Sequence, residues 1–91
     1  MLLSEKHTPT STSEKERVTQ AGGRIIFGRV LGTLAVSRSI GDIDYKYPHN
    51  KASADFVTAS PFVNKVDMSP TDEFLIIACD GLWYELCKWK C

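Results

Sequence analysis

The chain has 91 residues, a length that allows one small domain with a thin core. Eleven basic and eleven acidic side chains cancel, so no overall positive field would draw the chain to nucleic acid or to an anionic membrane. No apolar run approaches the roughly 18 residues that cross a bilayer, and the N-terminus lacks the apolar core of a signal peptide. We therefore expect neither a nucleic-acid nor a membrane partner.

A polar stretch opens the chain and leads into a short helix. Residues 1–13 are rich in Ser and Thr, which predicts a loosely ordered lead-in. A helix is predicted over 14–21, "EKERVTQA". Ser13 and Glu16 have the spacing of a capping box, in which a hydroxyl and a carboxylate satisfy backbone N–H groups of the first turn. The sequence thus predicts a helix that starts at residue 14.

The end of this helix and its inner face are also predicted. Gly22-Gly23 follow directly, and glycine adopts a left-handed C-cap without a Cβ clash. Val18 and Ala21 give the helix a weak apolar face. Because two turns are marginal in isolation, we expect this face to pack on another part of the chain.

The middle of the chain is glycine-rich and irregular. "RIIF", residues 24–27, favours a strand through its β-branched and aromatic content, and Gly28 and Gly32 interrupt regular structure after it. Residues 33–40 fit either a short helix or a tight irregular segment. Residues 42–56 are polar and turn-rich, which predicts a long loop of the kind that is often functional.

Two strands and a turn are predicted in the last third. Residues 56–68 alternate imperfectly around an internal proline, as in an edge strand or two short strands. In the turn over 69–73, Pro70 presets φ and Asp72 can close an Asx-type bond. "FLIIAC", residues 74–79, is apolar throughout, which predicts a strand buried on both faces.

Asp80 and Gly81 follow this predicted strand. A carboxylate at the end of a buried strand is held rigidly, as a metal ligand or a general base requires. The neighbouring glycine lets backbone and water approach it closely. In the other interpretation, Asp80 caps a turn and Gly81 supplies a positive φ. Spacing alone leaves both interpretations open.

Arg29 and Arg38 lie among small and apolar residues. A guanidinium group is well shaped to bind phosphate. The chain has neither the G-x-x-x-x-G-K-[ST] nor the G-x-G-x-x-G phosphate loop, so a glycine-bent connection held by Arg–Asp pairs is the alternative. His7 and His49 lie in polar loops and are interpreted as solvated side chains.

Three cysteines, Cys79, Cys87 and Cys91, lie near the C-terminal end. Without a secretory signal, we expect reduced thiols and a cytoplasmic or nuclear location. Cys87 and Cys91 would share one face of a helix. A zinc site needs further ligands and no C-x-x-C is present, so zinc binding is not expected.

Three stretches together resemble one family. "EKERVTQAGGRI" (14–25), "RVLGTLAVSRSIGDIDYK" (29–46) and "VTASPFVNKVDMSPTDEFLIIACDGLW" (57–83) follow the order and spacing of the type 2C protein phosphatases, the metal-dependent PPM family of Ser/Thr phosphatases. The resemblance implies an α+β fold, here a fragment of a β-sandwich of two antiparallel sheets flanked by helices. It implies a partial phosphatase domain over 14–83 and a divergent C-terminal tail over 84–91.

The resemblance also implies a chemistry. In the family, two Mg or Mn ions activate a water that hydrolyses phosphoserine or phosphothreonine in a phosphoprotein substrate. Asp80 would be a metal ligand, because it matches the family's Asp-Gly pair at the end of this strand. Arg29 and Arg38 would belong to a flap beside the active site, where they would steer phosphate or hold the flap.

The departures from the family pattern predict an inactive chain. The family's upstream acidic-glycine-histidine-glycine segment and its downstream Asp-Asn pair are absent, so at most one protein carboxylate ligand is present. Tyr84 and Lys6 each stand where the family has an aspartate. We expect an incomplete hydrolase, and whether the chain is an enzyme by itself is left open. The alternatives are a catalytically dead module that binds phosphoproteins or competes with the full enzyme, and an unrelated β-rich binding domain.

Overall fold

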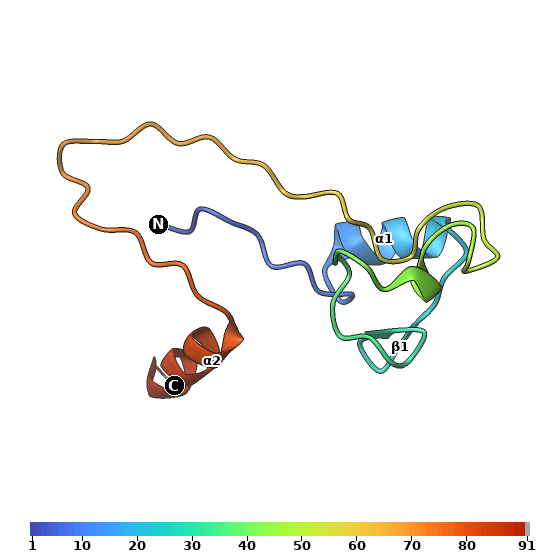
Figure 1. Ribbon diagram of the computed structural model, residues 1–91. Coiled ribbons are helices and arrows are strands. Elements are labelled where there is room, and N and C mark those ends of the chain that lie inside the picture. Colours follow the sequence, from blue (N-terminus) through green and yellow to red (C-terminus); the bar gives the residue numbers. More distant parts are fainter. Residues whose placement is uncertain (91) are drawn as a thin grey trace.

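The structure, a computed structural model, describes residues 1–90. The elements in chain order are α1 (Thr12–Gln20), β1 (Ile25–Ile26), β2 (Arg29–Val30), the 3₁₀ helix η1 (Ile43–Tyr45) and α2 (Asp80–Lys90). Figure 1 shows α1, the hairpin and η1 gathered together, with α2 apart from them at the end of a long extended segment. Two helices and a two-stranded antiparallel sheet give the described residues an α+β character.

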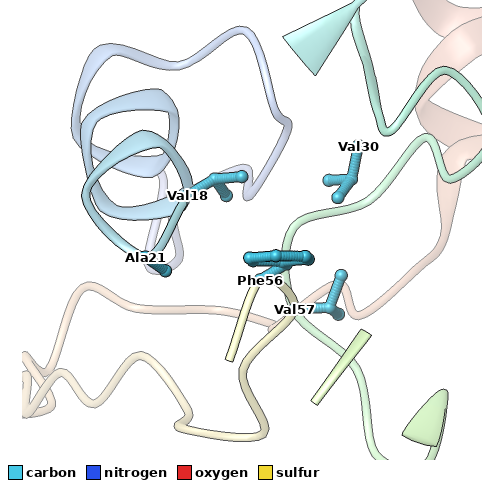
Figure 2. Close-up of a cluster of buried hydrophobic side chains, with 5 residues drawn as sticks. All are labelled: Val18, Ala21, Val30, Phe56 and Val57. Carbon is cyan, nitrogen blue, oxygen red and sulfur yellow. The ribbon is translucent and has the colours of Figure 1, made fainter. Parts of the chain in front are cut away.

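A small core joins α1 to the middle of the chain. Its buried members are Val18, Ala21, Val30, Phe56 and Val57 (Figure 2). Phe56 and Val57 reach α1 from more than thirty residues away, so a non-local contact supplies the packing that a two-turn helix needs. The predicted apolar face of Val18 and Ala21 is confirmed.

The start of α1 differs from the prediction. The N-cap is Ser11, and the capping box at Ser13 and Glu16 is wrong because both residues lie exposed within the helix. Ser11 caps with its backbone alone: its carbonyl oxygen accepts from Lys15 N at 2.8 Å, and its N–H donates to Thr8 O at 3.1 Å. A backbone turn before the helix therefore sets its first residue.

The end of α1 agrees with the prediction. Gly22 has φ +94°, in the left-handed region that glycine adopts without strain. Gly22 N donates to Thr19 O at 3.0 Å and Gly23 N to Val18 O at 2.9 Å, which satisfies carbonyl groups of the last helical turn.

A tight hairpin follows. β1 and β2 pair antiparallel, with Ile25 opposite Val30 and Ile26 opposite Arg29. Phe27 (φ +52°) and Gly28 (φ +71°) form the connection, and two positive φ values are typical of a type I′ turn. The strand predicted over 24–27 is confirmed at Ile25–Ile26, and Gly28 serves as the turn residue of a hairpin that the sequence reading missed.

The segment over 33–40 is irregular, as one of the two alternatives proposed. It is tied to the second half of the chain by an isolated parallel bridge between Arg38 and Thr58. Ser39 N donates to Thr58 O at 3.0 Å, and Thr58 N to Ser37 O at 3.3 Å. This bridge is the one strand-type contact in residues 56–68, where an edge strand or two short strands are predicted. Phe56 and Val57 lie in a bend, and residues 59–68 have no regular secondary structure.

The predicted buried strand over 74–79 is wrong for this structure. The side chain of Phe74 is 78% exposed and that of Ile77 is 86% exposed. A strand is buried by neighbours on both faces, and no segment of the described residues pairs with 74–79. The turn before it is confirmed, since Ser69 N donates to Asp72 Oδ2 at 2.7 Å and Asp72 N to Ser69 O at 3.0 Å. No helix within residues 1–90 has the length and apolar character to span a bilayer.

Candidate functional site

The main concentration of buried charge in the described part of the chain is a group formed by Glu14, Arg17 and Arg38, which we call the Glu14 cluster. Glu14 lies in the first turn of α1 and is 2% exposed. Its Oε2 accepts from Arg17 Nη2 at 2.9 Å, and its Oε1 accepts from Arg38 Nε at 3.0 Å and from Arg38 Nη2. One carboxylate therefore binds two guanidinium groups from different segments.

The two arginines extend the cluster to the backbone. Arg17 donates through Nη1 to Phe56 O at 3.1 Å and through Nη2 to Ser37 O at 2.9 Å. Arg38 Nη1 donates to Ser60 O at 3.2 Å. Because these acceptors lie outside α1, the cluster holds three parts of the chain in register: α1, the segment around residue 37 and the segment 56–60.

The pKa of Glu14 reflects these contacts. Burial by itself raises this pKa, but hydrogen bonds from Arg38 and Arg17 outweigh burial and lower it from 4.5 to about 2. The nearby Ser37 hydroxyl contributes to the same lowering without a hydrogen bond of ordinary geometry. A lowered carboxyl pKa stabilises the fold above pH 4.5, by an amount on the order of 3 kcal/mol, and this contribution is lost as the pH falls towards 2.

The structure separates the two arginines that the sequence singled out. Arg38 belongs to the Glu14 cluster. An ion pair therefore holds this glycine-bent connection, as one alternative predicted, but the acid is Glu14 of α1 and not an aspartate. Arg29 is exposed, and its Nη1 donates to Thr33 O at 2.9 Å, within its own turn. A role of either arginine in a flap stays a prediction.

Asp80 is the first residue of α2 and is exposed. An acidic side chain in the first turn of a helix interacts favourably with the helix dipole. Gly81 is the second residue of the helix and does not have a positive φ. The interpretation of Asp80-Gly81 as a turn in which Gly81 supplies a positive φ is therefore wrong. Figure 1 shows α2 apart from the hairpin and α1, so Asp80 is not brought together with Arg29 or Arg38.

The other candidate ligands are scattered. Residues 1–90 contain no group of three or more His, Cys, Asp or Glu side chains able to hold a metal ion, so these residues alone do not fit a metal centre. His7 is half-buried, with its ring 6.1 Å from that of Phe62, which corrects its interpretation as a solvated side chain; His49 is exposed as expected. Cys79 and Cys87 are free and exposed. Cys91, and with it the shared face of Cys87 and Cys91, lies outside the described residues.

Glu14, the central residue of the cluster, was not among the residues that the sequence pattern singled out. Glu14 and Arg17 are three residues apart, and this spacing places oppositely charged side chains next to each other on a helix. That signal identifies the pair, but it does not distinguish an exposed pair from a buried one. The partners that complete the cluster, Arg38 for Glu14 and the carbonyl oxygens of Ser37 and Phe56 for Arg17, are distant in the sequence.

Known proteins that are similar to this chain identify its family. The family model for protein phosphatase 2C matches residues 1–87. Protein phosphatase 2C homolog 2 of Schizosaccharomyces pombe is 51% identical over 82 residues, which are 89% of this chain and 22% of that protein. Human Protein phosphatase 1A is 44% identical over 84 residues, which are 90% of this chain and 22% of that protein.

A further relative and a solved structure agree with these matches. Protein spalten of Dictyostelium discoideum is 48% identical over 83 residues, 91% of this chain and 8% of that protein. A crystal structure of a phosphatase from Toxoplasma gondii superposes with a TM-score of 0.53 at 32% identity, over 64% of this chain and 17% of that chain. The chain therefore spans less than a quarter of the length of the relatives compared here. With the family model matching residues 1–87, this chain belongs to the protein phosphatase 2C family.

Proposed function

We propose that the chain supplies one part of a metal-dependent protein phosphatase domain that acts on phosphoserine and phosphothreonine in proteins. The observation that carries the proposal is the family match over residues 1–87, together with 44% identity to human Protein phosphatase 1A over 84 residues. The complete domain would be a β-sandwich of two antiparallel sheets with two Mg or Mn ions, and the protein would act in the cytoplasm or nucleus. Residues 14–83 would lie in this domain, with 84–91 as a divergent tail.

Asp80 is proposed as one metal ligand of that complete domain. Carboxylate oxygens are hard ligands that suit a hard divalent cation such as Mg. The exposed position of Asp80 leaves its oxygens free to bind a cation together with carboxylates from elsewhere in the domain. Because residues 1–90 contain no further grouped ligands, we do not expect this chain alone to hold a metal centre or to hydrolyse a substrate.

The Glu14 cluster has a positioning role in this proposal. Arg38 gives three of its N–H groups to Glu14 and Ser60, so its guanidinium is committed to holding the segment 37–60 against α1. Two of the five N–H groups of Arg38 remain for a phosphate, whose charge would lie next to the Glu14 carboxylate and be repelled by it. Arg29 is exposed and gives one hydrogen bond to its own turn, so it is the freer of the two arginines to contact a phosphate group.

A chimaera tests the proposal. Residues 1–87 of this chain replace the aligned segment of human Protein phosphatase 1A, and phosphate release from a phosphothreonine peptide is measured with Mn²⁺. The chimaera is expected to be active. Asp80→Asn in the chimaera is expected to lower kcat/KM by on the order of 100-fold or more, because loss of a group that only orients a metal ligand already costs about 10–100-fold, and loss of the ligand itself costs at least as much.

Asp67→Asn is the matched control for Asp80→Asn, since Asp67 is an exposed acid in the segment before α2 and is expected to keep the activity. A folded chimaera without activity would overturn the assignment of the whole chain. An Asp80→Asn chimaera as active as its parent would overturn the role of Asp80 alone.

A further inference from the structure

The chain contains three Ser/Thr-Pro dipeptides, Thr8-Pro9, Ser60-Pro61 and Ser69-Pro70. A kinase that selects proline after the acceptor residue uses its fixed φ and its missing N–H group. Such an enzyme also binds several residues on either side of the acceptor in its cleft. The three dipeptides share this local chemistry, so their surroundings in the fold decide which of them a kinase can reach.

The folded core restrains the first two dipeptides, although the side chains of Ser60 and Pro61 are themselves exposed. Pro9 is fully buried, and Thr8 O accepts from Ser11 N at 3.1 Å in the turn that starts α1. Ser60 is tied to the Glu14 cluster, because its carbonyl oxygen accepts from Arg38 Nη1 at 3.2 Å. Val57, three residues before Ser60, is a fully buried core residue. A kinase cleft that binds several residues on either side of the acceptor would have to displace buried Pro9 at the first site, or the Arg38 bond and buried Val57 at the second.

Ser69 lies in different surroundings. Every residue over 59–77 is exposed, and Figure 1 shows this part of the chain as a long extended trace away from α1. The bonds of Ser69 are local to its turn: N to Asp72 Oδ2 at 2.7 Å, O from Asp72 N at 3.0 Å, and Oγ with Thr71 Oγ1 at 2.9 Å. Opening this turn breaks exposed contacts and leaves the core intact.

From this contrast, we propose that Ser69 is a phosphate-acceptor site for a proline-directed protein serine/threonine kinase. Ser69 Oγ attacks the γ-phosphorus of ATP, the new Oγ–P bond forms as the bond from phosphorus to the ADP oxygen breaks, and the hydroxyl proton passes to the carboxylate base of the kinase. The products are the phosphoserine chain, ADP and a proton. This proposal does not depend on the proposed phosphatase function.

The phosphate changes the turn that receives it. The chain has a formal net charge of zero, and phosphorylation brings it to about −2 near neutral pH. The new charge lies in the turn that the Asp72 carboxylate closes, and Glu73 is the next residue in the sequence. Because like charges repel, Asp72 Oδ2 is expected to release Ser69 N and the turn is expected to open.

The test incubates the full chain with ATP and a proline-directed kinase and follows each site by mass spectrometry over time. Ser69 is expected to be modified at least about tenfold faster than Thr8 or Ser60, since local opening of a turn costs less than opening of the core. Ser69→Ala and Pro70→Ala are each expected to remove the fast phase. Asp72→Asn is expected to keep it, because the kinase reads proline and not the nearby acid.

Several outcomes would overturn the proposal. They are modification of Thr8 or Ser60 before Ser69, no transfer while a Ser-Pro reference peptide reacts, and a fast phase that survives Pro70→Ala. A Glu14→Ala chain gives an independent measurement, because loosening the core is expected to speed modification of Thr8 and to leave the rate at Ser69 unchanged. An equal change in the phosphorylation rates of Thr8 and Ser69 in the Glu14→Ala chain would show that burial in the core does not decide which site the kinase modifies.

Discussion

Replacing Glu14 with alanine is expected to unfold the core around α1. The substitution removes the carboxylate that binds Arg17 and Arg38 and leaves two partly buried guanidinium groups without their shared counter-charge. Removing one partner of a buried ion pair costs about 3–5 kcal/mol. A chain with a five-residue buried core has little stability to lose. Urea unfolding followed by far-UV circular dichroism measures the effect.

Glu16→Ala is the matched control, because Glu16 is an exposed acid of the same helix. Its free energy of unfolding is expected to stay within about 0.5 kcal/mol of the parent. The parent is also expected to lose stability between about pH 5 and pH 2, as the carboxylate of Glu14 becomes protonated, and the Glu14→Ala chain is expected to lack that loss. Equal stabilities of the two variants would contradict the role of the Glu14 cluster.

Gly23→Ala is expected to have the second largest effect on stability. A Cβ at residue 23 would lie 2.8 Å from Val18 Cγ1 and 3.0 Å from Phe56 Cδ1, closer than van der Waals contact permits. Both neighbours are buried core residues with little room to move. Overpacking of this kind costs about 1–3 kcal/mol. The measurement is the urea midpoint of the variant against that of the parent.

Gly81→Ala is the control for this substitution. A Cβ at residue 81 would have its nearest neighbour at 3.6 Å, the Sγ of Cys79, which is ordinary contact. Because alanine favours a helix over glycine by about 1 kcal/mol, Gly81→Ala is expected to keep or slightly raise the helical signal of α2. A Gly23→Ala chain as stable as its parent would show that α1 does not pack as closely on Phe56 as the structure has it.

The features that the sequence predicted correctly are mostly local. Gly22-Gly23 end α1, Ser69 and Asp72 close their turn, and the apolar face of the helix is buried. Each of these depends on a few consecutive residues and on their side-chain chemistry. The start of α1 was predicted two residues late, because a backbone turn at Thr8–Ser11 caps the helix and no side-chain motif marks it.

The features that the sequence did not predict depend on distant contacts. Glu14 is buried and bound by Arg38, which lies 24 residues away, and spacing along the helix gives no information about that contact. The run over 74–79 has the composition of a buried strand, yet burial requires neighbours that the described residues do not provide. Composition therefore indicated which residues favour burial, but not whether the described chain buries them.

The candidate site was predicted only in part. The sequence singled out Arg38, which the structure places in the one buried ionic cluster of residues 1–90, with Glu14 as its acid. Asp80 was singled out by its resemblance to a family ligand, and its role stays a prediction because a metal site needs several carboxylates in one place. Ligands contributed by distant segments have no signature in a single stretch of sequence.

The central claim is that this chain belongs to a metal-dependent phosphatase family and that residues 1–90 do not form a complete metal centre by themselves. The most direct test incubates the purified chain with Mn²⁺ and a phosphothreonine peptide and measures phosphate release, with human Protein phosphatase 1A as the positive control. We predict no release above the background of Mn²⁺ and peptide alone. Saturable turnover by the isolated chain, lost on addition of a chelator, would contradict the claim.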